Sequence, residues 1–248
     1  MENEKIRLNK YIASSGCCSR RKADELIKAG SVIINGQKVI EPGFLVSSKD
    51  KVVIQNKLIK PKAHVYIRYY KPAGYITTMN DEKGRRTIYD ALSDEVQNLK
   101  PAGRLDKDSS GLLILTNDGG FINELMHPSV KVPKVYRVIA EGKVTRSNLT
   151  AMEKGIEIEN GKTAYAYASI IDFEDGNTIM EIVLYQGLNR QIRKMLEILE
   201  HPVIALKRLS IGPVDLQGLK RGQFKYIKPK QIQEIKNYLK KLKKNAQH

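Results

Sequence analysis

The chain has 248 residues, enough for one large domain or two smaller ones, and its hydrophobic fraction of 41% supports a buried core. The formal net charge of +16 favours polyanionic partners, either nucleic acid or an anionic membrane surface. No apolar run approaches the ~18 residues of a membrane-spanning helix, and the polar N-terminus lacks the core of a signal peptide.

Residues 1–62 are expected to form a compact N-terminal module that begins with two short helices, 7–15 and 19–29. Ser19 is a suitable N-cap for the second helix, and Gly30 suits the position just after its end. Apolar residues at helical spacing place one face of this second helix in a core.

The same module continues with strand signals. Asn35-Gly36 lies between two short apolar segments and predicts a tight hairpin over residues 32–40, and residues 51–54 predict a further strand. Basic residues gather around the two helices and favour contacts with RNA or DNA phosphates, above all through Lys10, Arg20 and Arg21. The members of this basic cluster are Arg7, Lys10, Arg20, Arg21 and Lys22.

Residues 56–62 are polar and are expected to link this module to a larger domain, residues 63–248. Strand-like segments dominate the second domain, with helices predicted over 190–200 and 231–244. Strands and helices do not alternate strictly, so we predict an α+β fold with a mostly antiparallel mixed sheet and flanking helices. The predicted strands cover residues 65–70, 112–116, 136–140, 164–173 and 178–185.

Metal and disulfide chemistry have little support in the sequence. The two cysteines, Cys17 and Cys18, are neighbours that cannot staple a fold, and the four histidines are scattered singly. We therefore expect a cytoplasmic protein with no metal site and no cofactor.

The stretch GRLDKDSSGLLILTNDG, residues 103–119, places carboxylates beside a strongly apolar strand. Three interpretations are open for these acids taken alone. They accept backbone hydrogen bonds in a turn, or Asp106, Asp108 and Asp118 bind a divalent metal for phosphoryl chemistry. In the third, one carboxylate acts as a nucleophile or general base at the edge of a rigid sheet.

Several motifs in a fixed order decide among these interpretations. The chain resembles the pseudouridine synthases, in the branch that acts on ribosomal RNA and includes RsuA, RluB, RluE and RluF, and its first 60 residues resemble the S4-type RNA-binding module. A Gln-Gly-Leu variant at residues 186–188 resembles RluF and favours a large-subunit target. The motifs are Tyr69–Gly74 with Thr77-Thr78, Gly103–Asp106 with Ser110–Leu113, Lys134–Val138, Gly187–Met195, and Arg208–Gly212.

The resemblance assigns roles to individual residues. It implies that Asp106 is the nucleophile, that Tyr136 lines the pocket and stacks on the uracil, and that Arg193 forms an ion pair that keeps a partly buried Asp106 charged. Arg104 lies two residues before Asp106 in an extended segment, so both side chains are expected on one side. We expect Arg104 to fill the gap left by the flipped base.

Other positions complete the expected site. Asn189, Arg190 and Arg208 are expected to contact RNA, and Leu209 and Ile211 are expected to form apolar walls of the pocket. Asp108 and Asp118 are expected to be structural. The resulting interpretation is an enzyme that isomerises one uridine of ribosomal RNA, preferably of the large subunit, free or in an assembly intermediate, and that acts as a monomer.

Two other functions stay open from the sequence. One is a non-catalytic RNA-binding or ribosome-assembly protein that has kept the fold, and the other is a metal-dependent nuclease. The joint presence of Asp106, Tyr136 and Arg193 argues against a decayed site.

Overall fold

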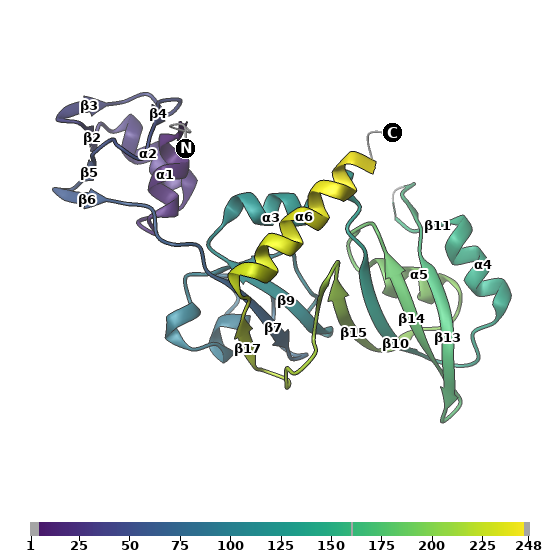
Figure 1. Ribbon diagram of the computed structural model, residues 1–248. Coiled ribbons are helices and arrows are strands. Elements are labelled where there is room, and N and C mark those ends of the chain that lie inside the picture. The colour runs from purple at the N-terminus through teal and green to yellow at the C-terminus, as the bar shows by residue number, and fades with distance from the viewer. Residues whose placement is uncertain (1–4, 160, 246–248) are drawn as a thin grey trace. The chain divides into compact units, whose positions relative to one another are not determined.

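The computed structural model describes residues 5–159 and 161–245, and the chain divides into two compact units, residues 1–64 and residues 65–248 (Figure 1). Each unit has a hydrophobic core of its own. Among the described residues, no helix is both long and apolar enough to cross a membrane.

The N-terminal unit packs two helices, α1 (Leu8–Ser14) and α2 (Arg20–Lys28), over short strands. Ser19 caps α2 as predicted, because its hydroxyl accepts a hydrogen bond from the Lys22 amide. The Asn35-Gly36 hairpin is also confirmed, with positive φ at both residues. The strands are β1 (Ile6–Arg7), β2 (Val32–Ile34), β3 (Gln37–Val39), β4 (Leu45–Val46), β5 (Val52–Ile54) and β6 (Lys57–Ile59).

The predicted linker over residues 56–62 is wrong in part. Lys57–Ile59 forms β6, which pairs with β5 across a turn at Gln55-Asn56. Both turn residues have positive φ, a conformation that Asn tolerates better than most residues. The turn contains no glycine, and the hairpin was missed for that reason.

The larger unit is built on a mixed, mostly antiparallel sheet in the order β13-β14-β10-β15-β9-β7-β17, so the predicted α+β class is confirmed (Figure 1). β8 pairs with β9, and β16 pairs with β15. A separate pair joins β11 (Ile156–Glu157) to β12 (Thr163–Ala164). The sheet strands are β7 (Tyr66–Lys71), β8 (Lys100–Ala102), β9 (Ser110–Thr116), β10 (Lys134–Ala140), β13 (Tyr167–Glu174), β14 (Asn177–Leu184), β15 (Val203–Ile211), β16 (Val214–Asp215) and β17 (Phe224–Tyr226).

In the described part of the larger unit four α-helices accompany this sheet, and two of them were expected. α5 (Gln191–Ile198) and α6 (Pro229–Asn245) confirm the predicted helices with slightly different ends. α3 (Gly119–Met126) and α4 (Arg146–Lys154) were not predicted. The short 3-10 helices are Ile88–Ala91, Asp94–Val96 and Pro128–Val130.

β9 is buried along its whole length because the sheet is covered on both faces at this strand. Leu112 and Ile114 pack with side chains of α3 and α6, whereas Leu113 and Leu115 pack against the segment that holds Tyr89. Alternate residues of a strand point to opposite faces, so two apolar environments require an uninterrupted apolar run. The run that follows Asp106 therefore reflects a strand enclosed on two sides.

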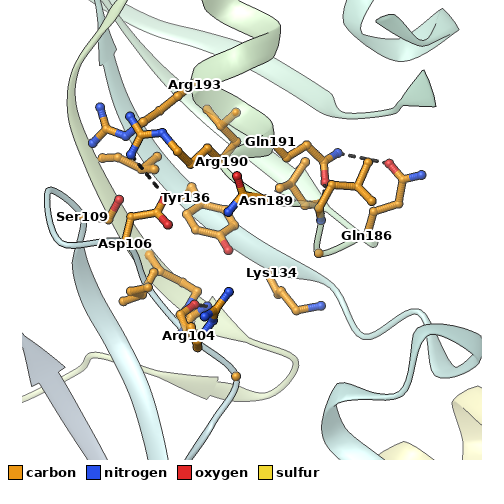
Figure 2. Close-up of a pocket in the computed structure, with 18 of the residues that line it drawn as sticks. Arg104, Asp106, Ser109, Lys134, Tyr136, Gln186, Asn189, Arg190, Gln191 and Arg193 are labelled. Carbon is orange, nitrogen blue, oxygen red and sulfur yellow. Dashed lines mark hydrogen bonds and ion pairs between the residues drawn. The ribbon is translucent and has the colours of Figure 1, made fainter. Parts of the chain in front are cut away.

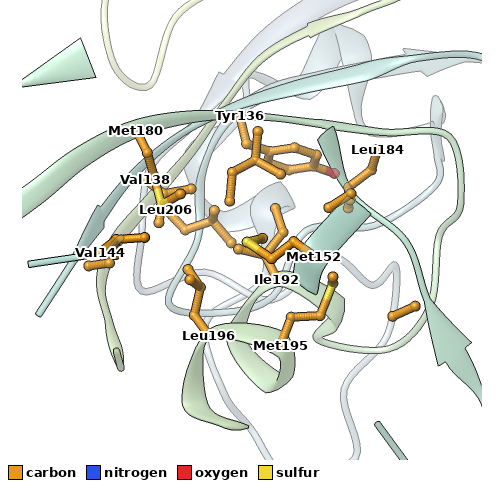
Figure 3. Packing of buried hydrophobic residues seen from close by; sticks show 14 of the residues in the cluster. Tyr136, Val138, Val144, Met152, Met180, Leu184, Ile192, Met195, Leu196 and Leu206 are labelled. Atoms are coloured by element: carbon orange, nitrogen blue, oxygen red, sulfur yellow. The ribbon is translucent and has the colours of Figure 1, made fainter. Parts of the chain in front are cut away.

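A second core lies on the other half of the sheet. Tyr136 of β10 and Met180 of β14 share it with Ile192 and Met195 of α5 (Figure 3). Because only one face of β10 and β14 is covered by this core, buried and partly exposed residues alternate along both strands. The packing fixes α5 and the face of β10 that carries Tyr136.

The two halves of the sheet meet at a short parallel contact between β9 and β15. Only Lys207 with Ser110 and Arg208 with Gly111 are paired there. Gly111 has a φ of +117°, and a Cβ at this position would collide with the backbone of Arg208. This close approach requires glycine, and it brings the loop before β9 next to β10 and β15.

Candidate active site

A cavity of about 320 Å³ lies where the two halves of the sheet meet (Figure 2). Its walls come from the loop before β9, from β10 and β15, and from the segment that leads into α5. Among its lining residues are Arg104, Asp106, Lys134, Tyr136, Arg190 and Arg208. Small-molecule sites in proteins generally span ~300–1,000 Å³, so the cavity is at the lower end of that range.

Two buried side chains hold the loop that carries Asp106. The Thr77 hydroxyl donates to the Leu105 carbonyl oxygen at 2.8 Å and accepts from the Leu105 amide at 3.2 Å. The Lys71 ammonium donates to the carbonyl oxygens of Asp106 at 3.0 Å and Ser109 at 2.7 Å. The backbone around Asp106 is therefore positioned by hydrogen bonds with the buried side chains of Lys71 and Thr77.

Lys71 is fully buried and also reaches the carbonyl oxygens of Pro72 and Lys107. An ammonium has three N–H donors, so four carbonyl oxygens share them. Burial is the main cause that lowers the pKa of Lys71 to about 8, against the attraction of Asp106 and Asp108. At neutral pH the side chain is still mainly protonated and can hold the loop.

The side chain of Asp106 is 34% exposed and faces the cavity. Arg190 Nη1 lies 4.0 Å from Asp106 Oδ2 and 3.6 Å from Asp108 Oδ2. In the described residues Arg190, and not Arg193, lies within 4.0 Å of the Asp106 carboxylate (Figure 2). The expected pair of Asp106 with Arg193 stays a prediction, because the charge of Asp106 still acts on Arg193. Arg190 has a left-handed backbone at the N-cap of α5, which directs its side chain differently from the helical residues that follow.

Arg193 lines the same cavity but makes other contacts. Its guanidinium donates to the Val203 carbonyl oxygen at 3.2 Å and to the Asp108 carbonyl oxygen at 3.3 Å. Burial, followed by the nearby charge of Arg190, lowers the pKa of Arg193, and the attraction of Asp108 and Asp106 opposes this shift. Within the described structure Arg193 connects α5, β15 and the Asp106 loop, which is a positioning arrangement.

Tyr136 and Arg104 line the cavity together with Asp106. Tyr136 is only 8% exposed, and its ring is held between the cavity and the core of Figure 3. Arg104 is exposed at the cavity edge and is opposed by no carboxylate within the described ion pairs. The expectation that Arg104 and Asp106 share one side agrees with this geometry.

The prediction that Arg208 contacts RNA phosphate does not fit its burial. Arg208 is 2% exposed, and its guanidinium donates to the Leu112 carbonyl oxygen at 2.8 Å and the Arg104 carbonyl oxygen at 3.4 Å. Its Nη2 is buried with no protein partner. Arg208 therefore supports the Arg104 backbone from inside the protein.

The predicted apolar walls, Leu209 and Ile211, are also wrong. They are absent from the cavity lining, and Ile211 packs in the core beside α6. Leu209 is the extra residue of β15 where the register with β10 shifts, between the pairs Val135–Ser210 and Tyr136–Arg208. Leu184 of β14 and Leu206 of β15 supply the apolar wall.

The remaining predicted contacts lie in different places. Asn189 is exposed and lines both this cavity and a second one of about 540 Å³, which Arg104 and Asp106 also line. Lys10 of α1 and Arg21 of α2 are exposed in the N-terminal unit, and Arg20 donates to Asn9 at 3.3 Å. These three basic residues are not part of the cavity.

Asp118 has a structural place that fits the expectation made for it. It caps α3 by accepting from the amides of Gly120 and Phe121, and it accepts from the Tyr66 hydroxyl at 2.7 Å. Within residues 5–159 and 161–245, no group of three or more His, Cys, Asp or Glu residues is arranged to hold a metal ion.

Two buried lysines at the site were given no role by the sequence. Lys71 and Lys134 both belong to family-like motifs, YYKPAG and KVYRV. Lys134 is 7% exposed and lines the cavity, and burial followed by repulsion from Arg208 lowers its pKa to about 8. A lysine two residues before Tyr136 on a strand shares its face, and that spacing was the available signal.

Comparison with known proteins gives a consistent result. The profile of a family described as RNA pseudouridylate synthase matches residues 65–198, and the S4 domain profile matches residues 6–52. The ribosomal large subunit pseudouridine synthase B of Bacillus subtilis is 40% identical over 93% of this chain and 95% of its own length. The dual-specificity RNA pseudouridine synthase RluF of Salmonella typhi is 36% identical over 88% of this chain and 74% of its own length.

A solved structure agrees with the fold. A crystal structure of a pseudouridylate synthase matches 96% of this chain and 99% of its own chain, with a TM-score of 0.65 and 26% identity. This match spans both units of the chain.

Proposed function

Because the chain belongs to the RNA pseudouridylate synthase family, we propose that it isomerises a specific uridine of large-subunit ribosomal RNA, with Asp106 as the nucleophile. One observation carries the assignment of Asp106. It is a carboxylate that faces the cavity beside Tyr136, on a loop fixed by Lys71 and Thr77. The large subunit is proposed from the name of the Bacillus subtilis relative.

The reaction needs no group donor and no net redox change. The N1–C1′ bond of uridine breaks, a C5–C1′ bond forms, C5 loses its proton and N1 gains one. A carboxylate is ionised at neutral pH and can form and then release a covalent bond to the nucleotide, so Asp106 is regenerated in each cycle. Arg190 keeps a positive charge beside this carboxylate throughout.

The target base has to leave its stack before it enters the cavity, which costs a few kcal/mol. Arg104 is exposed at the cavity edge, where its guanidinium can occupy the vacated position in the RNA. Stacking on the RNA bases is worth about 1–3 kcal/mol. Inside the cavity, the ring of Tyr136 offers a flat surface for the uracil.

The N-terminal unit supplies a separate surface that binds RNA. Lys10 and Arg21 are exposed on α1 and α2, and the match to the S4 domain covers both helices. Contacts of this kind are made with phosphates and position the RNA without reading its sequence. Such a surface can bind the phosphates of free ribosomal RNA and those of an assembly intermediate.

The function is tested by tritium release from unmodified large- and small-subunit ribosomal RNA labelled at uracil C5, with a chelator present. We expect release from large-subunit RNA with the wild type and none with Asp106→Ala. Asp108→Asn is the matched control, because Asp108 lies two residues away on the same loop with a side chain 61% exposed.

The other outcomes separate the competing functions. Release from small-subunit RNA alone contradicts the proposed target but not the activity. RNA binding without release from either RNA points to a non-catalytic RNA-binding protein. Chelator-sensitive cleavage of the RNA points to a nuclease. Equal loss in Asp106→Ala and Asp108→Asn contradicts a special role of Asp106.

A further inference from the structure

Lys134 is a buried cation in the cavity to which the proposed function assigns no role. It begins β10, is 7% exposed, and lines the same cavity as Asp106 and Tyr136. Its ammonium donates to the Val132 carbonyl oxygen at 3.0 Å. No carboxylate forms an ion pair with it in the described part of the chain.

This environment is unfavourable for a positive charge in the free protein. Burial of an ammonium is costly unless it is paired, and one carbonyl oxygen uses one of its three donors. Arg208, which is 2% exposed, adds a second positive charge and has an Nη2 atom without a protein partner. Two buried cations at one cavity favour a ligand that presents hydrogen-bond acceptors to them.

The placement of Lys134 relative to Asp106 indicates which part of the ligand it meets. In Figure 2 the ring of Tyr136 lies between Asp106 and Lys134, so the two charged residues are at different ends of the cavity. Asp106 has to reach atoms bonded to uracil N1, whether it attacks the sugar or the base. The C4 carbonyl is across the ring from N1 and therefore faces the opposite end.

We propose that Lys134 is a specificity-determining residue that donates a hydrogen bond to O4 of the target uracil and thereby distinguishes uridine from cytidine. This inference rests on the proposed function. An ammonium has donors and no acceptor, so it binds a carbonyl oxygen but not the amino group that cytosine carries at the same position. A site that pairs one group in this way rejects an analogue that leaves its donor unpaired.

The same contact acts on the reaction itself. When the N1–C1′ bond breaks, its electron pair stays on the base and is shared with O4. A fixed ammonium at O4 binds this form more strongly than the neutral ring, which lowers the barrier. Loss of the ammonium is therefore expected to reduce kcat as well as the preference for uridine.

The test first locates the modified uridine, by carbodiimide labelling and primer extension on the RNA that releases tritium. It then measures binding of two RNA hairpins that span this position and differ only in uridine or cytidine there. Asp106→Asn protein is used so that no turnover occurs. We expect the uridine hairpin to bind about 10- to 100-fold more tightly, the range expected for a hydrogen bond to a charged group. Adding Lys134→Met should bring this ratio close to one. Lys134→Gln should do the same, and its side-chain amide is still a donor for the Val132 carbonyl oxygen.

Two controls make the result specific. Lys154→Met removes an exposed lysine at the end of α4 that lines neither cavity, and it should leave the ratio unchanged. Lys134→Arg keeps donors and charge and should preserve part of the preference.

The proposal is overturned if both neutral variants keep the wild-type ratio of affinities for the two hairpins. If they keep this ratio while both hairpins bind more weakly, Lys134 is a purely structural residue. A wild-type enzyme that isomerises no ribosomal uridine would instead contradict the proposed function.

Discussion

Lys10 and Arg21 in the N-terminal unit are exposed to solvent, whereas Lys71 and Arg208 in the larger unit are almost completely enclosed by protein. The exposed cations have few protein partners and project from two short helices. The enclosed ones donate to backbone carbonyl oxygens of the segments that form the cavity. The two units thus use the same residue types in opposite environments.

The difference separates two functions of positive charge. An exposed cation acts on RNA phosphates, and its effect weakens as salt rises. An enclosed cation acts through geometry, since it fixes backbone that would otherwise move, and solvent ions screen it little. Substitutions in the two units should therefore differ in what they change and in how salt modifies the effect.

The largest expected effect comes from Lys71→Met. Removal of the ammonium leaves several buried carbonyl oxygens unsatisfied, at about 1–3 kcal/mol each. We expect a loss of at least about 3 kcal/mol in the free energy of unfolding, measured by urea titration, and a fall in kcat of more than ~100-fold.

Lys107→Met is the control for this change because Lys107 is exposed on the same loop. Its effect on stability should stay within about 0.5 kcal/mol, as for most surface substitutions. A stable Lys71→Met protein with normal kcat would show that the hydrogen bonds beneath Asp106 do not position it.

The pH dependence of kcat is the next largest effect. The pKa of Lys134 is lowered to about 8 by burial and by Arg208, and that of Lys71 to about 8 mainly by burial, with Asp106 and Asp108 opposing the shift. Both are protonated at pH 7 and lose a proton as the pH rises through 8. The rate should therefore fall about tenfold per pH unit for each proton that the reaction requires.

Lys134→Arg separates the two lysines, since arginine stays charged throughout this range. Above pH 8, log kcat of Lys134→Arg should fall with pH less steeply than that of the wild type. The difference in slope should be one, which corresponds to one required proton. An unchanged limb would mean that Lys134 does not contribute its charge to the reaction.

A smaller effect is expected from Arg190→Gln. The guanidinium is 42% exposed and the Asp106 carboxylate 34% exposed, so the pair is worth about 0–1 kcal/mol. We expect a decrease of up to about fivefold in kcat/KM, larger at low salt than at high salt. Arg193→Gln should instead lower the melting temperature, because it removes the hydrogen bonds to Val203 and Asp108.

The opposite result would revive the prediction made from the sequence. If Arg193→Gln keeps the melting temperature but reduces kcat/KM more than Arg190→Gln does, Arg193 moves to Asp106 when RNA binds. The two variants therefore decide between the observed pairing and the expected one.

The sequence was sufficient for the fold class and for the grouping of Asp106, Tyr136 and Arg104. The fold class depends on apolar periodicity, which a single sequence contains. The grouping of Asp106 with Tyr136 depends on the resemblance to the pseudouridine synthases, and only the placement of Arg104 beside Asp106 follows from the extended segment itself. The partner of Asp106 was not predictable, because it depends on the left-handed backbone of Arg190 at the start of α5. A helix drawn from residue 190 onward would direct this side chain elsewhere.

The face of β15 was misassigned for a related reason. An arginine is usually placed toward solvent and a leucine toward a cavity, which predicts Leu209 and not Arg208 as a pocket residue. In this strand the order is reversed, because Arg208 is enclosed and donates to two carbonyl oxygens from other segments. Register with β10 also shifts between Val135 and Tyr136, and no local pattern in the sequence reports that shift.

The smallest effect on chemistry is expected from charge removal in the N-terminal unit. Lys10→Ala, Arg20→Ala and Arg21→Ala combined should leave kcat within about twofold when RNA is saturating, because none of the three lines the cavity. Binding should weaken, and the slope of log K against log salt should flatten by about 0.9 for each phosphate that the protein no longer neutralises.

A matched triple change tests whether position matters in this unit or only total charge. Lys38→Ala, Lys49→Ala and Lys57→Ala remove the same charge from exposed positions outside α1 and α2. If the helices grip phosphate, only the first triple variant should change the slope by about two or more. Equal slopes for both triple variants would show that the unit attracts RNA through its overall field, and the exposed cations would then make no defined contacts with phosphate.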